Sequence, residues 1–554
     1  MTGGLMQLVG KGAQDVLFTG NPSFTHFRSM YKRHTEFAME HFRLYFRSAN
    51  LSLLPNGPLT LRTKVDRHAQ LLHDCYLSVT IPPIYSPVVP STDTIGYEFQ
   101  WAKNLGYNMI NYVSVMINGS EIVRHTGEWM KLHAALNFDK NKKDLVDRLV
   151  GNIPEMYDPA NSFDRLNQYP HAISNSSGLA APSIAGRVLT IPLHFWFCES
   201  IGHALPLVAL QHSEVEFVVE LKNMYQLFTV LDVDTGSPTF RTRISPNLGN
   251  ENYSMAHFLS PPFSSQNIPV NPNLLKWKLD PFIEANYIFV SDAEVAHIAT
   301  TDHSFLIKQI DMSQGHKLYG PSVDLHVLMK NMCTRAVWVA QRDDRLKLND
   351  YDNYTNWENQ NKPPFSGTDL YSSGVELPSG VAQKEIILES SIIIDGKERF
   401  GYKQTEFFTH IQNYKHNSGS SIVDIPGIYT YSFSLDHSTT QPSGAINGSQ
   451  FNKIILRNTY VQPPLNSSVT PGLAAPSQVC VLKSTINSPN PTVVPDPTIL
   501  GSNGKPLFGP NDLITIVQKS EANTLKYTFQ VRVFVESYNF LRVIGGIANV
   551  VFSS

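Results

Sequence analysis

Cysteine is scarce in this chain of 554 residues, and its four cysteines lie far apart. They are Cys75, Cys198, Cys333 and Cys480. A zinc site requires paired spacings such as Cys-x-x-Cys, and a disulfide-stapled secreted scaffold requires a higher cysteine density. The pattern argues against both kinds of protein. We therefore expect buried or inert thiols in a reducing compartment.

Charge is low as well. Charged residues make up 16 % of the chain, against about 25 % in typical globular proteins. The net charge of −3 gives no indication of bulk nucleic-acid binding. The surface is therefore expected to be polar and uncharged, or covered in an assembly.

Long apolar runs are missing. No segment approaches the roughly 18 apolar residues of a membrane-spanning helix. The first residues also lack the charged start and clean apolar run of a secretion signal. We expect a soluble protein that is made in the cytosol.

The sequence motifs of common catalytic sites are absent. No two of the nineteen histidines are separated by two, three or four positions, which excludes His-x-His and His-Glu-x-x-His. There is no Gly-x-Ser-x-Gly nucleophile elbow, and Gly12 replaces the Ser or Thr of a phosphate-binding loop after Gly10-Lys11. The carboxylate pair of a glycosidase has no sequence spacing to detect. We therefore predict no catalytic, cofactor-binding or metal-ligating residues, no cofactor and no enzyme activity.

Several polar residues have simple structural interpretations. His34 and His194 are expected to be hydrogen-bonded core histidines, and the charged run 342–345 is expected to be a solvated loop. Asn-x-Ser/Thr occurs seven times. Asn118 and Asn447 are explained as turn residues. Sugars could attach in loops, but we expect these asparagines to be unmodified; the loop sites are Asn252, Asn353 and Asn466.

What the sequence does contain begins with an apolar N-terminal stretch, residues 3–37. Five glycines in the first twenty residues disfavour a free-standing helix. The stretch nevertheless has too much apolar surface for a solvated tail; its apolar residues are Leu5, Met6, Leu8, Val9, Val16, Leu17 and Phe18. The chain's own body or a neighbouring molecule must cover it. The basic cluster at residues 31–34 is expected to have a structural role rather than to contact phosphate.

The rest of the chain has β patterning that repeats. Asn118-Gly119 and Asp395-Gly396 each lie between apolar runs, which is the strongest short signal for a hairpin. Helical spacing follows the first hairpin, over 127–138. The order of elements recurs between the halves, with 188–197 matching 428–433, 205–221 matching 442–456 and 287–290 matching 533–535. Two tandem copies of one β domain explain this order.

Many short strands with long loops predict β-sandwiches, although this pattern does not separate a jelly roll from other Greek-key sandwiches. The first strand is expected to begin at about Arg43. Four segments rich in Pro, Ser, Asn and Gly are expected to be surface loops; they are 151–187, 223–280, 341–382 and 462–512.

Residues 3–37 contain, in order, an Ala13-Gln14-Asp15 step, a Thr19-Gly20-Asn21-Pro22 turn and the segment 31–37. In this ordered run the chain resembles the major capsid proteins of nucleocytoplasmic large DNA viruses. The resemblance continues through 191–197, 205–211, 442–444 and 538–553, and so covers essentially the whole chain. The insertions 223–280 and 462–512 match no motif of that family.

This resemblance implies an all-β fold of two tandem eight-stranded jelly rolls with short helices and long loops. The implied domains are an N-terminal arm (1–25), a first jelly roll (26–300) and a second one (301–554). It also implies homotrimeric, pseudo-hexagonal capsomers that tile an icosahedral virion shell, assembled in the host cytoplasm. The implied partners are neighbouring capsomers, minor capsid proteins and an internal membrane, without direct nucleic-acid contact. A carbohydrate-binding or carbohydrate-active tandem β-sandwich is the alternative.

Overall fold

The computed structural model describes most of the chain, and the fold below refers to those residues. They are 2–48, 51–53, 57–86, 98–165, 168–172, 181–231, 243–246, 254–259, 277–357, 384–417, 425–437, 441–461, 479–485, 488–494, 512–518 and 528–552.

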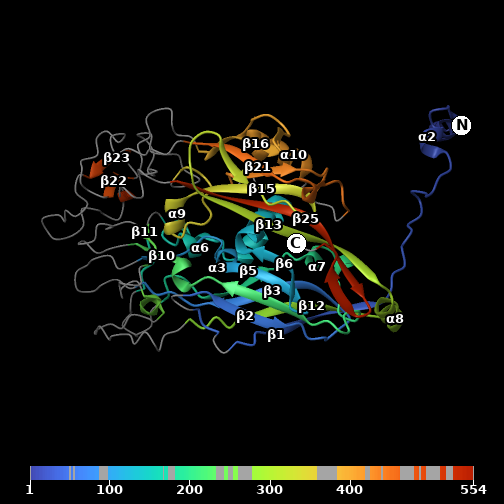
Figure 1. Cartoon of the computed structure of the whole chain (residues 1–554), viewed down its shortest axis with the longest axis horizontal. Coiled ribbons are helices and arrows are strands. Elements are labelled where there is room, and N and C mark those ends of the chain that lie inside the picture. Colours follow the sequence, from blue (N-terminus) through green and yellow to red (C-terminus); the bar gives the residue numbers. More distant parts are fainter. Residues whose placement is uncertain are drawn as a thin grey trace.

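The first half of the chain builds two antiparallel sheets (Figure 1). One sheet has the order β1-β12-β3-β7, with β8 also pairing with β3, and the other has the order β2-β9-β5-β6. Their strands are β1 (Phe37–Tyr45), β2 (Leu59–Lys64), β3 (Leu71–Ile81), β5 (Ile110–Ile117), β6 (Ser120–Thr126), β7 (Arg187–Pro192), β8 (Leu205–Pro206), β9 (Val215–Leu221) and β12 (Phe282–Val290).

The second half builds a second pair of sheets. One has the order β13-β25-β15-β19, with β20 and β26 at its margins, and the other has the order β14-β21-β16-β17, with β18 pairing with β16. The strands are β13 (His303–Leu318), β14 (Val323–His326), β15 (Met332–Arg342), β16 (Ile387–Ile394), β17 (Lys397–Glu398), β18 (Lys403–Gln404), β19 (Ile428–Ser432), β20 (Ile446–Asn447), β21 (Ile454–Tyr460), β25 (Phe529–Ile544) and β26 (Ile547–Val550).

Both halves have the topology of a jelly roll. If the eight strands that correspond between the halves are counted in chain order, each half forms one sheet from strands 1, 8, 3 and 6 and another from strands 2, 7, 4 and 5. The predicted repeat is confirmed, because β5, β7, β8 and β12 occupy the places of β16, β19, β20 and β25. The predicted fold class is confirmed as well. Separate apolar cores fill the two sandwiches.

Local turn chemistry explains the two hairpins. Asn118 and Gly119 have φ values of 51° and 78°, and Asp395 and Gly396 have φ values of 47° and 80°. Both central residues of a type I′ turn need positive φ, which Asn, Asp and Gly adopt most readily. The Asp395 carboxylate additionally accepts the backbone N–H of Lys453 at 2.8 Å, which ties the second hairpin to the chain entering β21.

Short helices connect the strands. They are α3 (Leu105–Met109), α4 (Gly127–Asn137), α5 (Lys140–Leu149), α6 (Pro154–Tyr157), α7 (Trp196–Glu199), α8 (Asp292–Thr300), α9 (Asp343–Lys347) and α10 (Gln412–His416), the last preceded by a π-helical turn over Phe407–Ile411. Helix α4 confirms the prediction for 127–138. Within the part of the chain that the structure describes, no helix is long and apolar enough to cross a membrane.

Two of the predicted surface loops contain strands, so that prediction was wrong in part. In 223–280, β10 (Phe228–Leu231) pairs with β4 (Glu98–Trp101) and β11 (Arg243–Ile244), and Phe228 is fully buried. In 462–512, β22 (Val479–Thr485) pairs with β23 (Ser488–Val494) and with β24 (Asp512–Gln518). The partner of β10 in β4 lies far earlier in the chain, and Pro489 and Pro491 disfavour a strand at β23.

The charged run 342–345 is not a solvated loop. The side chains of Arg342 and Asp344 are almost fully buried, and Arg342 Nη2 donates to Asp344 Oδ2 at 2.6 Å. Burial alone would raise the pKa of Asp344, but the adjacent Arg342 and Arg345 charges lower it below its usual range. The predicted loop 341–382, which contains this run, begins with the last two residues of β15 and continues into α9.

The N-terminal region differs from the expectation in two ways. Residues 3–9 and 16–19 form short helices, α1 (Gly3–Val9) and α2 (Val16–Thr19), although helix was disfavoured. The glycines lie at helix ends, where their cost is small: Gly10 and Gly20 are C-caps. Strand β1 begins at Phe37 rather than at about Arg43, and residues 2–36 before it are all exposed.

Candidate functional site

The two jelly rolls meet along helix α4, and this junction is the main buried polar site of the described residues. The helix starts where Thr126 Oγ1 accepts the backbone N–H of Trp129 at 3.1 Å. A Cβ at Gly127 would overlap the carbonyl oxygens of Tyr107 and Ile110. The first turn of α4 can therefore lie this close to α3 only because residue 127 is glycine. Sequence and packing thus fix where α4 begins and how closely it lies on its own domain.

The apolar side of α4 faces the second jelly roll. Trp129, Leu132 and Leu136 are fully buried in one cluster with side chains of the second domain. These partners are Val337 and Val339 from β15, Ile428 from β19, Phe534 from β25, and Tyr354. Each large apolar side chain buried in this way contributes about 1.5–3 kcal/mol. The apolar cluster therefore holds the two domains together.

Charged side chains of α4 also reach the second domain. Glu128 accepts from Arg532 Nη2 at 2.7 Å and from the Tyr354 hydroxyl at 3.0 Å. One turn later, Lys131 forms a buried ion pair with Asp352. Asp352 also accepts from the side-chain amide of Asn108 at 3.1 Å.

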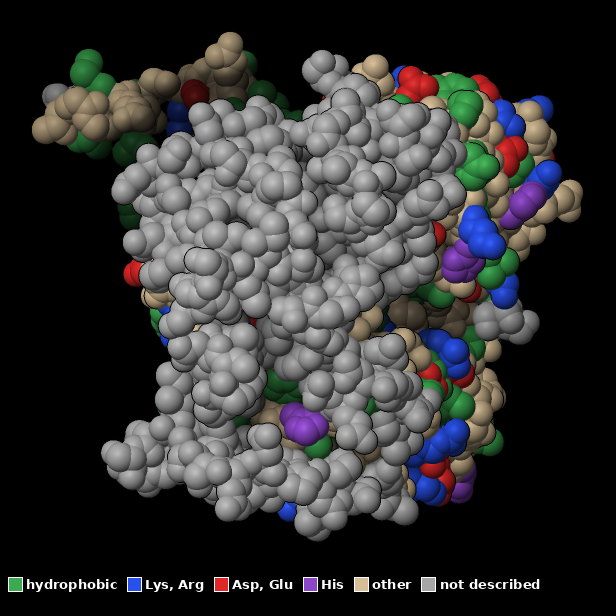
Figure 2. Space-filling model, turned by 90° about the vertical axis from the view of Figure 1, so that its left-hand side faces the viewer, with side chains coloured by type: hydrophobic (Ala, Val, Ile, Leu, Met, Phe, Trp, Pro, Cys, Tyr) green, Lys and Arg blue, Asp and Glu red, His purple; other side chains and the backbone are tan. Residues whose placement is uncertain are grey.

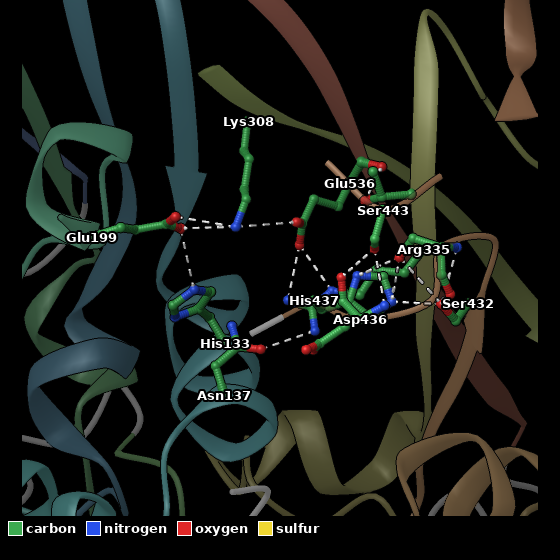
Figure 3. Close-up of polar contacts among 12 residues, drawn as sticks. His133, Asn137, Glu199, Lys308, Arg335, Ser432, Asp436, His437, Ser443 and Glu536 are labelled. Carbon is green, nitrogen blue, oxygen red and sulfur yellow. Dashed lines mark hydrogen bonds and ion pairs between the residues drawn. The ribbon is translucent and has the colours of Figure 1, made fainter. Parts of the chain in front are cut away.

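The third polar contact lies at the C-terminal end of α4 (Figure 3). Arg335 of β15 donates through Nε to Glu536 of β25 at 2.9 Å and through Nη1 to Asn137 of α4 at 3.0 Å. Lys308 of β13 lies between two carboxylates, 3.1 Å from Glu199 and 3.8 Å from Glu536. Glu199 belongs to α7 of the first domain, so Lys308 links the domains directly.

Two histidines flank this charge cluster. His133 of α4 lies 3.8 Å from Glu199, and His437 lies 2.7 Å from the Ser432 hydroxyl. Burial is the main cause that lowers the pKa of both histidines, and for His437 the Arg335 charge adds to it, giving a pKa of about 3. His437 is therefore neutral at physiological pH.

The carboxylates of the cluster remain ionised. Burial would raise the pKa of Glu536, but the charges of Arg335 and Lys308 outweigh burial and lower it from 4.5 to about 2. In the same way Lys308 and His133 lower the pKa of Glu199 to about 2 against the effect of burial. Opposite charges in contact thus compensate for their loss of water, as buried ion pairs require.

This arrangement can hold two domains in one orientation. Any other packing of the domains would separate the charges of these pairs and leave buried charges without a partner. Such packings are strongly disfavoured because an uncompensated buried charge is costly. Among the described residues, no group of three or more His, Cys, Asp or Glu side chains has the arrangement of a metal site. The contacts of the junction fix the orientation of the two jelly rolls relative to each other.

The residues discussed from sequence lie mostly elsewhere. His194 is half-buried, and its Nε2 lies 2.8 Å from the Tyr107 hydroxyl, whereas His34 is exposed and is not a core residue. Asn353 is buried and donates to the Trp357 carbonyl at 2.8 Å, which leaves no room for a sugar. Cys75 and Cys333 are buried free thiols, as expected, while Cys198 is partly exposed.

Sequence reasoning missed the junction residues. Glu128, Lys131 and Asn137 lie on the helix whose spacing was recognised, and charged residues in an otherwise apolar helix are the one signal that pointed to polar partners. Those partners are more than 190 residues away in the sequence.

Family profiles match both halves of the chain. The description "Major capsid protein N-terminus" applies to residues 25–247, and "Large eukaryotic DNA virus major capsid protein" applies to residues 294–477.

Individual proteins agree with these profiles. The chain is 24 % identical over 517 residues to probable capsid protein 4 of Acanthamoeba polyphaga mimivirus, covering 82 % of this chain and 92 % of that protein. It is 25 % identical over 536 residues to the major capsid protein of Phaeocystis pouchetii virus, covering 83 % and 94 %. A chain of the PBCV-1 virus capsid superposes with a TM-score of 0.60 at 17 % identity, covering 96 % of this chain and 100 % of that one. That last likeness is one of fold.

Proposed function

The chain belongs to the large eukaryotic DNA virus major capsid proteins, and from this premise we propose that it forms the trimeric capsomers of an icosahedral virion shell. The observation that carries the trimer is the junction on α4, which joins two domains of the same topology into one block. Three such blocks contain six jelly rolls, an outline that can tile a surface with local sixfold neighbours. Closed threefold symmetry stops the first step of assembly at three chains, because a closed ring leaves no open end to extend into a filament.

The domain limits of the proposal follow from the sheets. We propose an N-terminal arm followed by jelly rolls at 26–300 and 301–554. The support is that strands β1 to β12 pair only among themselves in the described chain, as do β13 to β26. The arm limit at residue 25 is supported less closely, since exposed residues continue to position 36.

The partners of the proposal are neighbouring capsomers, minor capsid proteins and an internal membrane, without direct contact to nucleic acid. Mixed surface charge supports the last point. In the view of Figure 2, Lys and Arg lie interspersed with Asp and Glu among the described side chains on the right, and the net charge is −3. The proposed place of synthesis is the host cytoplasm, and the proposed role is structural and not enzymatic.

Light scattering coupled to size-exclusion chromatography tests the trimer. At micromolar concentration, the molar mass from light scattering is expected to be three times the 62.1 kDa of a single chain. Permanent interfaces of this type bury more than roughly 2,000 Å² and do not dissociate on dilution into this range. A species that stays monomeric would contradict the proposal, and a small oligomer that binds a glycan array would favour the carbohydrate-binding alternative.

A further inference from the structure

An open apolar groove lies on the outer face of the sheet β1-β12-β3, beside helix α8. Its volume is 350 Å³, within the range of roughly 300–1,000 Å³ that is usual for ligand pockets. The lining side chains include Phe37 and Met39 of β1, Ile201, Ile288 of β12, Ile298 of α8 and Phe305 of β13. We call this surface the α8 groove.

The α8 groove has the properties of a binding surface. Ile201 is 60 % exposed and Phe37 is 56 % exposed, although both are large and apolar. Exposed apolar side chains that gather in one concave place usually mark an interaction site. A partner for this groove should therefore present apolar side chains on a narrow segment.

The N-terminal arm, residues 2–36, offers such a segment. It projects away from the body beyond α8 (Figure 1), and in Figure 2 it stands clear at the upper left. Leu17 is 83 % exposed and Phe18 is 91 % exposed on α2, and Leu8 on α1 is similarly uncovered. The hydrogen bonds of the arm helices stay within the arm, as between the Thr19 hydroxyl and the Asp15 carbonyl at 2.8 Å. Both helices therefore lack the cover that their apolar side chains require.

The groove and the arm also carry opposite charges. Glu294 of α8 lines the groove, and its Oε2 is buried with no hydrogen-bond partner among the described residues. An unpaired buried carboxylate oxygen is costly and is normally satisfied. Lys11 is the only basic residue in positions 2–24 and lies between the two apolar helices of the arm. The arm can thus supply both the apolar side chains and the cation.

The arm of the same molecule is poorly placed to enter the groove. Thr35 and Phe37 themselves line the groove, so the arm starts at its rim and leads away from it. An extended run spans at most about 3.3–3.6 Å per residue, so positions 21–35 can bridge up to about 50 Å to another molecule.

We propose that the α8 groove binds the N-terminal arm of a second copy of this chain, with the apolar side chains of α2 in the groove and Lys11 paired with Glu294. Each copy then donates one arm and accepts one, a head-to-tail contact that either closes a ring or continues from block to block. This inference goes beyond the proposed function, because it needs only two copies of the chain and no virion.

Mixed-chain disulfide trapping tests the contact. One chain carries Leu17→Cys and a second, distinguishable by mass, carries Ile201→Cys; both positions are well exposed, so neither change should disturb folding. The two chains are co-expressed, so that both can enter the same oligomer, and after mild oxidation a disulfide-linked heterodimer is expected on non-reducing gels. In a matched control, Leu145→Cys replaces Ile201→Cys, because Leu145 is 63 % exposed on α5 outside the groove, and no heterodimer should form.

Charge reversal supplies the second arm of the test. Lys11→Glu is expected to reduce the trapped heterodimer severalfold, and adding Glu294→Lys to the acceptor chain should restore it. Three outcomes would overturn the proposal: equal trapping at the control position, a disulfide that forms only within a single chain bearing both cysteines, or no trapping in the mixture. Capture of the arm by vesicles without trapping would instead assign it to a membrane. The trimer test above does not depend on any of these results.

Discussion

At the scale of single residues, the junction depends on charges that have lost most of their water. Arg335 is 2 % exposed and holds Glu536 in two contacts, 2.9 Å from its Nε and 2.8 Å from its Nη2. Because each charge is buried against the other, they stabilise the fold as a pair and destabilise it singly.

Replacing Arg335 by Met should therefore destabilise the protein by about 3–5 kcal/mol, since it leaves the buried Glu536 carboxylate without its main partner. Urea unfolding followed by circular dichroism measures the loss. The double variant Arg335→Met with Glu536→Leu should recover much of it. Arg457→Met is the matched control, because the Arg457–Asp324 pair is exposed, and its loss should change little. A similar loss in both single variants would argue against a special role of the buried pair.

Buried histidines make the stability depend on pH. The pKa of His437 is about 3 in the folded chain, against an ordinary 6.5, because of burial and the Arg335 charge. Below pH 6.5 the unfolded chain binds the additional proton, so stability is lost as the pH falls from 6.5 towards 3, by about 2 kcal/mol at pH 5 for this one group. Glu199 and Glu536, with pKa values of about 2, lose their contribution only between pH 4.5 and 2.

Urea midpoints at pH 7.5 and pH 5.0 measure this dependence. His437→Gln keeps a hydrogen-bonding side chain near Ser432 but does not titrate, so its midpoint should fall less on acidification than that of the unchanged protein. An unchanged pH dependence in this variant would show that other groups dominate.

At the scale of elements, α4 is the part on which both domains depend. Gly127 lies in its first turn against the carbonyl oxygens of α3 residue Tyr107 and of Ile110. Gly127→Ala should therefore push α4 off its own domain and cost at least about 2 kcal/mol, as overpacking commonly does. Gly401→Ala is the matched control, since a Cβ there meets no atom within 4 Å. Thermal unfolding of both variants measures the difference, and equal midpoints would contradict the close approach of α4 to α3.

Replacing the Pro-rich part of 484–506 with a short Gly-Ser linker would leave the trimer intact if the predicted loop 462–512 contained no strands. Strand β23 (Ser488–Val494) lies within it and pairs with β22, so the replacement would also remove a strand.

At the scale of the whole molecule, the arm is separate from the two jelly rolls. All of residues 2–36 are exposed, and the first strand begins at Phe37. Deleting residues 2–20 should therefore leave folding and trimer formation unchanged, because it removes no core side chain, and should reduce assembly into shells. Light scattering reports the trimer, and electron microscopy of assembly reactions reports the shells. Failure of the truncated chain to fold would place the arm in the core of the domain.

The sequence by itself determined the features that depend on neighbours along the chain. Asn118-Gly119 and Asp395-Gly396 predicted both hairpins, because positive φ is a property of those residues and needs no distant partner. Recurrence of the same element order predicted two copies of one domain, and helical spacing predicted α4. The jelly-roll topology itself came from the family resemblance, since strand order cannot be derived from local patterns.

Only the tertiary structure decided which charges are buried. The run 342–345 has the composition of a solvated loop, yet Arg342 and Asp344 are buried. Lys131 and Glu128 likewise find their partners, Asp352 and Arg532, only after two domains have folded and packed. A charge can leave water when an opposite charge is already held in contact with it, and contacts between residues hundreds of positions apart are set by the packing of the domains.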